Sequence, residues 1–449
     1  ADLSIGIDVT GAVALRANQD LCSVGMKTIG SAFQVDADRA AKLGLGSTPG
    51  LEVHIRPYLN GRDFTGTARG IFVLDFFGQD VETLREKFPA AYQYLLEYAK
   101  PERNQNRNSI FRERWWVIGH PRQQFRKATA GLSRYIATIE TSKHGFFAFV
   151  PIQITPDSTL VTIAVENSAV LGTLSSSIHK TWFLAAGGLL EDRPRYNKTT
   201  CFEPFPFPIA TDDQQAHLRS LAEQLDAHRK RQQAAYPDLT LTGMYNVLDK
   251  LRSGEPQTAK ERVIHEQGLV SVLRQLHDEI DAAVLDAYGW GDLLPLLRVA
   301  HGNDAPADGA SRDEAKRAFD EAILERLVAL NTERAAEEAR GLVRWLRPAF
   351  QHPTAQAAPE QAELAAGQGG DEAAAPAAAA KPLPWPKDAV AQVRAVADAL
   401  AASPVALDAD ALATRFTARG PWKKRLPQLL DMLVALGRAR EQDGRYSGR

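Results

Sequence analysis

The segment from residue 351 to residue 386 constrains most strongly how this chain can fold. It reads QHPTAQAAPEQAELAAGQGGDEAAAPAAAAKPLPWP, with hardly a large apolar side chain before Leu383 and Trp385. A stretch of this composition cannot bury enough surface to offset the conformational entropy lost on ordering it. We therefore expect a disordered, flexible linker that separates two independently folded parts of the chain.

The part before this linker begins with strand-like runs of β-branched and aromatic residues, broken by Gly, Pro and Asn. Runs of this kind predict a mixed β-sheet. Two apolar-periodic stretches, 81–99 and 167–187, predict helices between them. The strand-like runs are IFVLDFF at 71–77, RWWVIG at 114–119, RYIATIE at 134–140, GFFAFVPIQIT at 145–155 and TLVTIAVE at 159–166.

The pattern changes after Pro208. Leu218, Leu221 and Leu225 lie on one face of a long predicted helix, and two further long helices follow within 268–290 and 314–341. Beyond the linker, three short helical runs and a hairpin with Asp-Gly at its tip are typical of a small winged-helix-like module. The predicted fold class is α+β, in four parts: a mixed-sheet domain at 1–208, an α-helical subdomain at 209–350, a disordered linker at 351–386 and a winged-helix-like module at 387–449.

Length and composition exclude several classes of protein. At 449 residues the chain is too long for one core. Its only cysteines, Cys22 and Cys201, lack the spacing of a zinc site or a disulfide framework. The sequence contains no apolar run of membrane-spanning length, so we expect a cytoplasmic protein with no membrane partner.

No catalytic motif is found in the sequence. It lacks GxxxxGK[ST], GxGxxG after a strand, HExxH and GxSxG. It also lacks the FxGxG-like loop and the Asn/Asp/Ser-Pro-Pro-aromatic motif of adenosylmethionine-dependent amino-methyltransferases. The stretch EPFPFP at 203–208 does not replace that motif, because Glu203 is followed by a single Pro and then Phe. Alternating Pro and Phe fixes an extended backbone with rings to anchor it, which favours a structural clamp between two domains.

Two other kinds of site are weakly indicated. Asp75, Glu82 and Glu86 with Lys87 would suit a nuclease, but acids four residues apart on an amphipathic helix usually face water. A second helical pair, from 277 to 281, offers a His and an Asp to a metal but has no third ligand, so a surface or capping role is the simpler interpretation.

The strongest functional signal is a basic tract between Lys100 and Lys143. It holds ten Lys or Arg and three acids, and Arg, Asn and Gln are interleaved with aromatic residues. Lys and Arg neutralise phosphates, and Arg, Asn and Gln pair with base edges, so the tract predicts contact with double-stranded DNA. With three cations from the stretch before EPFPFP, the candidate DNA-binding residues are Arg103, Arg107, Arg112, Arg114, Arg122, Gln123, Gln124, Arg126, Lys127, Arg134, Lys143, His144, Arg193, Arg195 and Lys198.

Several linked stretches resemble the target-recognition region of large DNA adenine methyltransferases. The resemblance begins with HIRPYLNGRDF at 54–64 and FPAAYQYLLEYAKPER at 88–103, and continues through RYIATIETSKHGFFAFVPIQITPDSTL at 134–160 and LEDRPRYNKTTCFEPFPFP at 190–208. The helical stretch LTLTGMYNVLDKLRSGE at 239–255 is similar to the segment that follows this region. The family includes fused restriction-modification enzymes of types IIG and IIL and methyltransferases of phage-defence systems.

The resemblance implies a sequence-specific DNA-recognition region of an N6-adenine methyltransferase. It also implies that the catalytic domain, which binds S-adenosylmethionine, lies before Ala1 in the same polypeptide, because no cofactor site is expected in this chain. Two alternatives remain open. One is a binding-only specificity subunit that acts with a separate catalytic methyltransferase or nuclease chain, and the other is a winged-helix scaffold for protein partners.

Overall fold

The computed structural model describes residues 8–190, 193–306 and 311–353, and shorter stretches within 383–448. The chain divides into two compact units, Ala1–Glu360 and Gln361–Arg449. Most of the predicted linker, together with the tip of the predicted hairpin at 443–444, lies outside the described residues. Each unit is described by itself.

The first unit contains two four-stranded sheets. One is fully antiparallel, in the order β1-β8-β5-β6, and the other has the order β2-β4-β3-β7 with a parallel pair at its β3-β7 edge. All of β8 is buried, which fits the continuous apolar run in its sequence. The strands are β1 (Cys22–Val24), β2 (Gln34–Val35), β3 (Ile55–Leu59), β4 (Phe72–Leu74), β5 (Arg134–Ile139), β6 (Ala148–Pro151), β7 (Thr155–Pro156) and β8 (Leu160–Ile163), and a separate hairpin pairs β9 (Leu189–Leu190) with β10 (Arg193–Pro194).

Four of the five strand-like runs contain strands, but the strand predicted at 114–119 is wrong. This run forms a turn that follows a short helix. The reason is the anchoring of its two indole rings. Trp115 is buried with its ring 5.8 Å from that of Tyr92, and Trp116 donates from Nε1 to the carbonyl oxygen of Gln79 at 2.9 Å. The Trp115 ring therefore contacts α4, and the Trp116 ring is held by the loop before α3.

Each long helix predicted within the first 208 residues is divided in two. Pro89 begins a new helix directly after Phe88, and Ser176 caps a new helix by accepting from the backbone N–H of His179. A π-helix at Leu95–Ala99 follows the first break. The α-helices here are α1 (Ala37–Lys42), α2 (Gly61–Thr65), α3 (Val81–Lys87), α4 (Pro89–Tyr94), α5 (Lys100–Asn104), α6 (Ser109–Glu113), α7 (Gln123–Thr129), α8 (Ser168–Ser175) and α9 (Ser177–Ala186).

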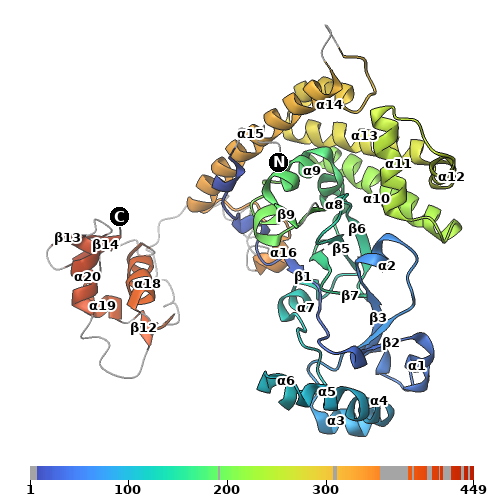
Figure 1. Ribbon diagram of the computed structural model, residues 1–449. Coiled ribbons are helices and arrows are strands. Elements are labelled where there is room, and N and C mark those ends of the chain that lie inside the picture. Colours follow the sequence, from blue (N-terminus) through green and yellow to red (C-terminus); the bar gives the residue numbers. More distant parts are fainter. Residues whose placement is uncertain are drawn as a thin grey trace, which may run out of the picture. The chain divides into compact units, whose positions relative to one another are not determined.

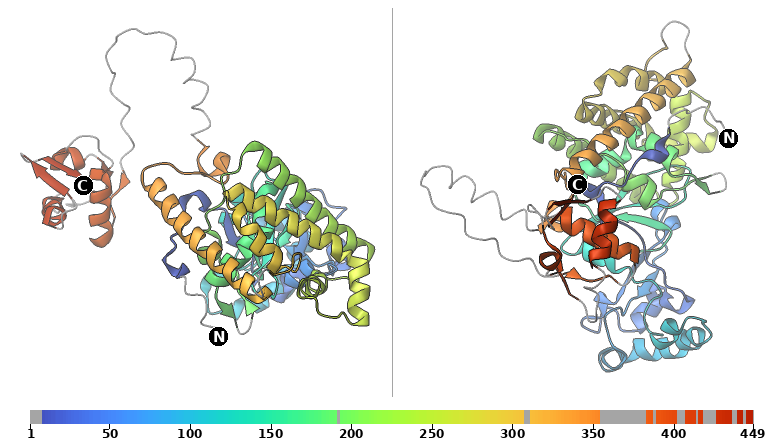
Figure 2. Two further views of the ribbon diagram at one scale, coloured as in Figure 1. Left: turned by 90° about the horizontal axis from the view of Figure 1, so that it is seen from above. Right: turned by 90° about the vertical axis from the view of Figure 1, so that its left-hand side faces the viewer.

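The helices predicted after Pro208 are confirmed. Two of them start at capping boxes, with Thr211 and Ser311 as the capping residues, and a further helix that was not predicted starts at a capping box with Thr258. Figures 1 and 2 show that the long helices α10, α13 and α15 gather on one side of the sheets. The helices are α10 (Asp212–Ala235), α11 (Leu241–Ser253), α12 (Ala259–Gly268), α13 (Val270–Tyr288), α14 (Leu294–Ala300), α15 (Arg312–Ala339) and α16 (Pro348–Gln351).

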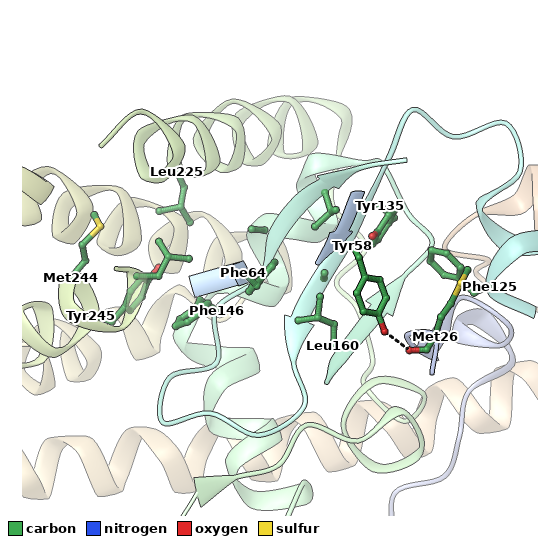
Figure 3. Packing of buried hydrophobic residues seen from close by; sticks show 14 of the residues in the cluster. Met26, Tyr58, Phe64, Phe125, Tyr135, Phe146, Leu160, Leu225, Met244 and Tyr245 are labelled. Atoms are coloured by element: carbon green, nitrogen blue, oxygen red, sulfur yellow. Dashed lines mark hydrogen bonds between the residues drawn. The ribbon is translucent and has the colours of Figure 1, made fainter. Parts of the chain in front are cut away.

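One hydrophobic core runs through both the sheets and these helices. Met26 and Phe125 belong to the same cluster of buried side chains as Leu225 of α10 and Tyr245 of α11. Figure 3 shows these residues on either side of the β-strands, with the hydroxyl of Tyr58 donating to the carbonyl oxygen of Met26. The predicted domain boundary at residue 208 is thus crossed by a continuous core.

The EPFPFP stretch is held by side chains from three distant segments. Asn18 donates to the carbonyl oxygens of Phe202, Glu203 and Phe205 at 2.8–3.2 Å. Asn331 of α15 donates to the carbonyl oxygen of Pro204 at 2.6 Å. The hydroxyl of Tyr288, at the end of α13, donates to the carbonyl oxygen of Pro206 at 2.9 Å. A proline-rich backbone offers carbonyls but few N–H groups, and these donors satisfy its carbonyls, in agreement with the predicted structural clamp.

The second unit has a small core of its own, which includes Val396, Leu412, Leu430 and Leu433. A bridge joins Leu407 to the last strand. The described residues of this unit include three helices and an antiparallel strand pair, as predicted, while the winged-helix assignment stays a prediction. The elements are β11 (Leu383–Pro384), α18 (Ala389–Ala401), α19 (Ala409–Ala413), β12 (Phe416–Thr417), α20 (Leu426–Ala435), β13 (Ala439–Gln442) and β14 (Arg445–Gly448). Across the described parts of both units, we find no helix long and apolar enough to cross a membrane.

Candidate nucleic-acid interface

Most of the basic tract folds into α5, α6, α7 and the loops between them, and its end forms β5 and the loop after it. Four of the predicted DNA-binding side chains point into solvent here. Within the described residues, none of the four makes a hydrogen bond or an ion pair through its side chain, so each is free to meet a phosphate or a base. They are Arg107, Arg114, Gln123 and Lys127.

A second group of predicted residues is exposed or half-buried but already has partners. Arg126 forms an ion pair with the buried carboxylate of Asp75 and donates from Nε to the carbonyl oxygen of Pro121 at 2.7 Å. This ion pair also gives Asp75, which the sequence analysis considered as a nuclease carboxylate, a structural role. The remaining pairs are Arg134 with Glu223, Arg195 with Glu140, Lys198 with Glu203, Gln124 with Asp20 and Lys143 with Asn246.

Two further predicted residues are Arg112, on α6 within the tract, and Arg193, on β10 outside it. Arg112 is exposed, and its Nη1 donates to the carbonyl oxygens of Asn106 and Arg107 at 2.6 and 3.0 Å, which fixes the loop before α6. Arg193 is exposed on β10 and also takes part in an interaction.

Two of the predicted residues, Arg103 and His144, are buried and do not face solvent. His144 lies 2.9 Å from the amide oxygen of Asn246 and 3.6 Å from the carboxylate of Asp249, both on α11. Its burial lowers the pKa of the imidazole, which therefore stays neutral at physiological pH. His144 thus ties the loop before β6 to the helical part of the unit.

Arg103 is held inside the α5–α6 region. Its Nη2 donates to the carbonyl oxygens of Thr28 and Val117 at 2.9 and 3.0 Å. Its guanidinium carbon lies 4.7 Å from the ring centroid of Phe33 and 5.1 Å from that of Phe111, so aromatic faces cover it. Burial lowers the pKa of this guanidinium, and Nε and Nη1 have no hydrogen-bond partner.

A short antiparallel contact beside Arg103 brings Lys27 and His120, which the sequence pattern did not single out, close to the predicted Arg122. Lys27 and His120 pair through both backbone hydrogen bonds, at 3.3 and 2.8 Å. Both residues are exposed. Arg122 follows, half-buried, and donates from Nε to the carbonyl oxygen of Gly25 at 3.0 Å. No local sequence motif predicts this pairing, because its two segments come from distant parts of the sequence.

The positive charges around His120 affect its titration. Burial, followed by the charges of Arg122, Lys27 and Arg103, lowers the pKa of the His120 imidazole. All three named neighbours are cations, so the local field is positive. We call Lys27, His120 and Arg122 the cationic turn.

Three side chains between α13 and α14 have a spacing that could suit a metal. Asp278, Asp281 and His301 offer ligand atoms within 4.8 Å of one another. However, Arg252 already donates to Asp278 at 2.8 Å, and Asp281 accepts from the backbone and hydroxyl of Ser177, the first residue of α9. These partners identify a buried polar contact between helices, and they confirm a capping role for Asp281.

Comparisons with known proteins give one kind of match. No protein-family model matches the sequence, and neither does any curated protein. Among solved structures, the fold resembles that of the type IIL restriction-modification enzyme MmeI, solved in complex with DNA, with a TM-score of 0.51 and 17% sequence identity. The likeness covers 73% of this chain, and the chain spans only 38% of the length of that enzyme. At this identity the likeness describes the fold.

Proposed function

We propose that this chain recognises specific sequences in double-stranded DNA, as the recognition part of an N6-adenine DNA methyltransferase from a restriction-modification or phage-defence system. The observation that carries the proposal is the group of cations on the α5–α7 side that face solvent without an acidic partner among the described residues. Arg107, Arg114 and Lys127 are its members, together with the cationic turn. Unpaired cations that project from a folded surface suit a polyanion with regularly spaced phosphates.

The fold likeness adds to this proposal, because the matched enzyme was solved with DNA bound. The unpaired side chains also include an amide, Gln123, which can read a base edge. Methyl transfer would be supplied by a catalytic domain in cis or a catalytic subunit in trans, and that part would bind S-adenosylmethionine. In this scheme the present chain contributes the choice of DNA sequence.

Duplex binding by the full chain tests the recognition role. We expect binding whose affinity falls steeply as salt increases, because each neutralised phosphate releases condensed counterions. Selection from a pool of random duplexes should enrich one sequence, and the enriched duplex should bind more tightly than its scrambled version. Failure to bind duplex DNA at low salt, or binding without any enriched sequence, would contradict the proposal.

The methyltransferase part needs a separate test. Host DNA should carry N6-methyladenine in the selected sequence when the complete gene or gene pair is expressed, and single-molecule sequencing detects that mark. Alanine substitution of Arg107, Arg114 and Lys127 together should remove the mark without lowering the amount of protein. A mark that persists unchanged in this variant would separate the modification from the proposed interface.

A further inference from the structure

The cationic turn gathers positive charge on one face of the backbone. Directly opposed residues of an antiparallel pair have side chains on the same face, so Lys27 and His120 project together. The side chain of Arg122 donates from Nε to the carbonyl oxygen of Gly25, two residues before Lys27, which holds the guanidinium near this pair. Because that contact uses only Nε, the two terminal nitrogens of Arg122 remain to bind an anion.

Arg103 lies close to this face, because its charge is among those that lower the pKa of His120. It is 1% exposed, and its hydrogen bonds go to two neutral carbonyl oxygens. A buried guanidinium without an anionic partner is unfavourable unless another charge compensates it. Burial lowers the pKa of Arg103, and the charge of Glu102, its neighbour in the sequence, offsets this lowering only in part. Two donors of the guanidinium have no hydrogen-bond partner.

The charge balance of the turn differs from that of its surroundings. Among the ion pairs in the described part of the chain, none involves Lys27, Arg103 or Arg122. Arg126, one helical turn further on, is instead neutralised by Asp75. Two donors of Arg103 have no partner and no carboxylate of the described residues pairs with Lys27 or Arg122, and this gap in compensation points to an anionic ligand that is external to the chain.

The backbone of the turn is strained in two places. Ile29 has φ 48° and Arg122 has φ 50°, values in the left-handed region. This conformation costs about 1–2 kcal/mol for a residue with a Cβ, and it is rare for a β-branched side chain such as Ile. The space for Ile29 exists because residue 119 is Gly, where a Cβ would lie 2.6 Å from the Ile29 side chain. Strain of this kind collects at ligand-binding sites, where the surrounding packing maintains it.

We propose that Lys27, His120 and Arg122 clamp one phosphate of the DNA backbone, with the buried Arg103 as a fixed charge beneath them. This inference rests on the proposed DNA-binding function and assigns one contact within it. A phosphate positions the duplex without reading its sequence. The clamp would therefore fix the register in which nearby side chains such as Gln123 meet the bases.

The salt dependence of duplex binding tests the clamp. Lys27→Ala and Arg122→Ala should each lower the slope of log K against log salt concentration, by up to about 0.9, the value for one phosphate that is no longer neutralised. Lys260→Ala is the matched control, because Lys260 is exposed on α12, away from the basic tract. Lys27 is exposed and not part of the core, so its variant should keep the melting temperature of the parent protein.

An uncharged methylphosphonate in place of one backbone phosphate identifies the phosphate that the clamp contacts. A duplex with a single methylphosphonate at the clamped position should bind the parent protein more weakly than the normal duplex does. This loss of affinity should equal the loss that Lys27→Ala causes with the normal duplex. Combining the two changes should add little further loss, because both remove one contact. If the affinity losses from Lys27→Ala and from the methylphosphonate add fully at every position of the methylphosphonate, the proposal is overturned.

The outcomes separate the clamp from the function on which it rests. If the parent chain does not bind duplex DNA at low salt, the proposed function fails. If it binds, but Lys27→Ala and Arg122→Ala keep the parental salt slope, the clamp alone fails. Inorganic phosphate should compete with DNA no better than chloride at equal ionic strength. Specific competition by phosphate that disappears in Lys27→Ala would show a site for the free ion and overturn the backbone assignment.

The pH dependence gives an independent readout. A bound phosphate opposes the fields of Lys27, Arg122 and Arg103, so it raises the pKa of His120 from its lowered value in the free protein. DNA binding then takes up a proton, and affinity should rise as pH falls from the pKa of His120 in the complex towards its lower pKa in the free protein. His120→Gln should abolish this increase and leave binding at pH 8 nearly unchanged. A parental pH profile in His120→Gln would contradict the contact.

Discussion

Replacement of Asn331 should show how strongly the EPFPFP joint depends on one amide. Asn331 is 1% exposed on α15. Its Oδ1 accepts from the backbone N–H of Val13 at 3.0 Å, and its Nδ2 donates to the carbonyl oxygens of Val13 and Pro204 at 2.9 and 2.6 Å. One side chain thus connects the N-terminal segment, the joint and the last long helix of the unit.

Asn331→Ala removes three hydrogen bonds from this place. At about 1 kcal/mol net for each, the free energy of unfolding should fall by about 3 kcal/mol. The unfolding entropy of globular proteins is about 2.1 cal/mol/K per residue near 60 °C, or roughly 0.7 kcal/mol/K for a unit of this size. The melting temperature should therefore fall by about 4 °C.

Asn331→Asp should be worse than Asn331→Ala at neutral pH. The new carboxylate keeps the contact to the N–H of Val13 but places negative charge against two carbonyl oxygens, so its folded-state pKa lies above the ordinary value of about 3.9. A raised acidic pKa lowers stability progressively as pH rises from the unfolded value through the folded one. The deficit of Asn331→Asp relative to Asn331→Ala should accordingly shrink as the pH is lowered from 7 to 5.

Thermal unfolding followed by circular dichroism measures all three proteins, and Glu333→Ala serves as the control. Glu333 is exposed on the same helix, and alanine maintains helix propensity there. If Asn331→Ala melts within 1 °C of this control, the joint does not depend on the amide. An Asn331→Asp deficit that is independent of pH would refute the electrostatic part of the reasoning.

Three further predictions concern the interface and the helical part. Arg126→Met should destabilise the fold by about 3–5 kcal/mol because it leaves a buried carboxylate unpaired, whereas Lys127→Ala should weaken DNA binding with an unchanged melting temperature. Gly119→Ala should destabilise by about 1–3 kcal/mol, because the new methyl group would overlap Ile29, and should weaken DNA binding with it. Leu269→Gly should raise stability by about 0.5–1 kcal/mol, because Leu269 has φ 43° at the end of α12, where glycine carries no such strain.

Each of these three predictions has a control variant or an outcome that would contradict it. Gly291→Ala is the control for the glycine variant, since nothing lies within 4 Å of a Cβ there and its φ is not positive. Equal melting temperatures for the Arg126 and Lys127 variants would show that the ion pair contributes nothing. A loss of stability in Leu269→Gly would mean that the exposed leucine makes contacts worth more than the strain.

The candidate site was only partly predictable from the sequence. The basic tract marked the right segment, and Arg107, Arg114 and Lys127 do face solvent. Arg103 belongs to the same tract and has the same chemistry, yet it is buried between Phe33 and Phe111. The composition of the tract gives the number of charges, but the solvent exposure of each side chain depends on residues from other segments that pack against it. The sequence pattern therefore could not distinguish the exposed basic residues from the buried Arg103.

The sequence by itself determined much of the local structure: the helices that begin after Thr211 and Ser311, and the strands in four of the five strand-like runs. These features depend on neighbours a few residues away, through periodicity, capping and steric restriction. Only the tertiary structure decided that Lys27 meets His120 and that Asn331 reaches Val13 and Pro204. Such pairings join distant segments, and their energy comes from burial and from satisfying buried polar groups, which exist only once the chain has packed.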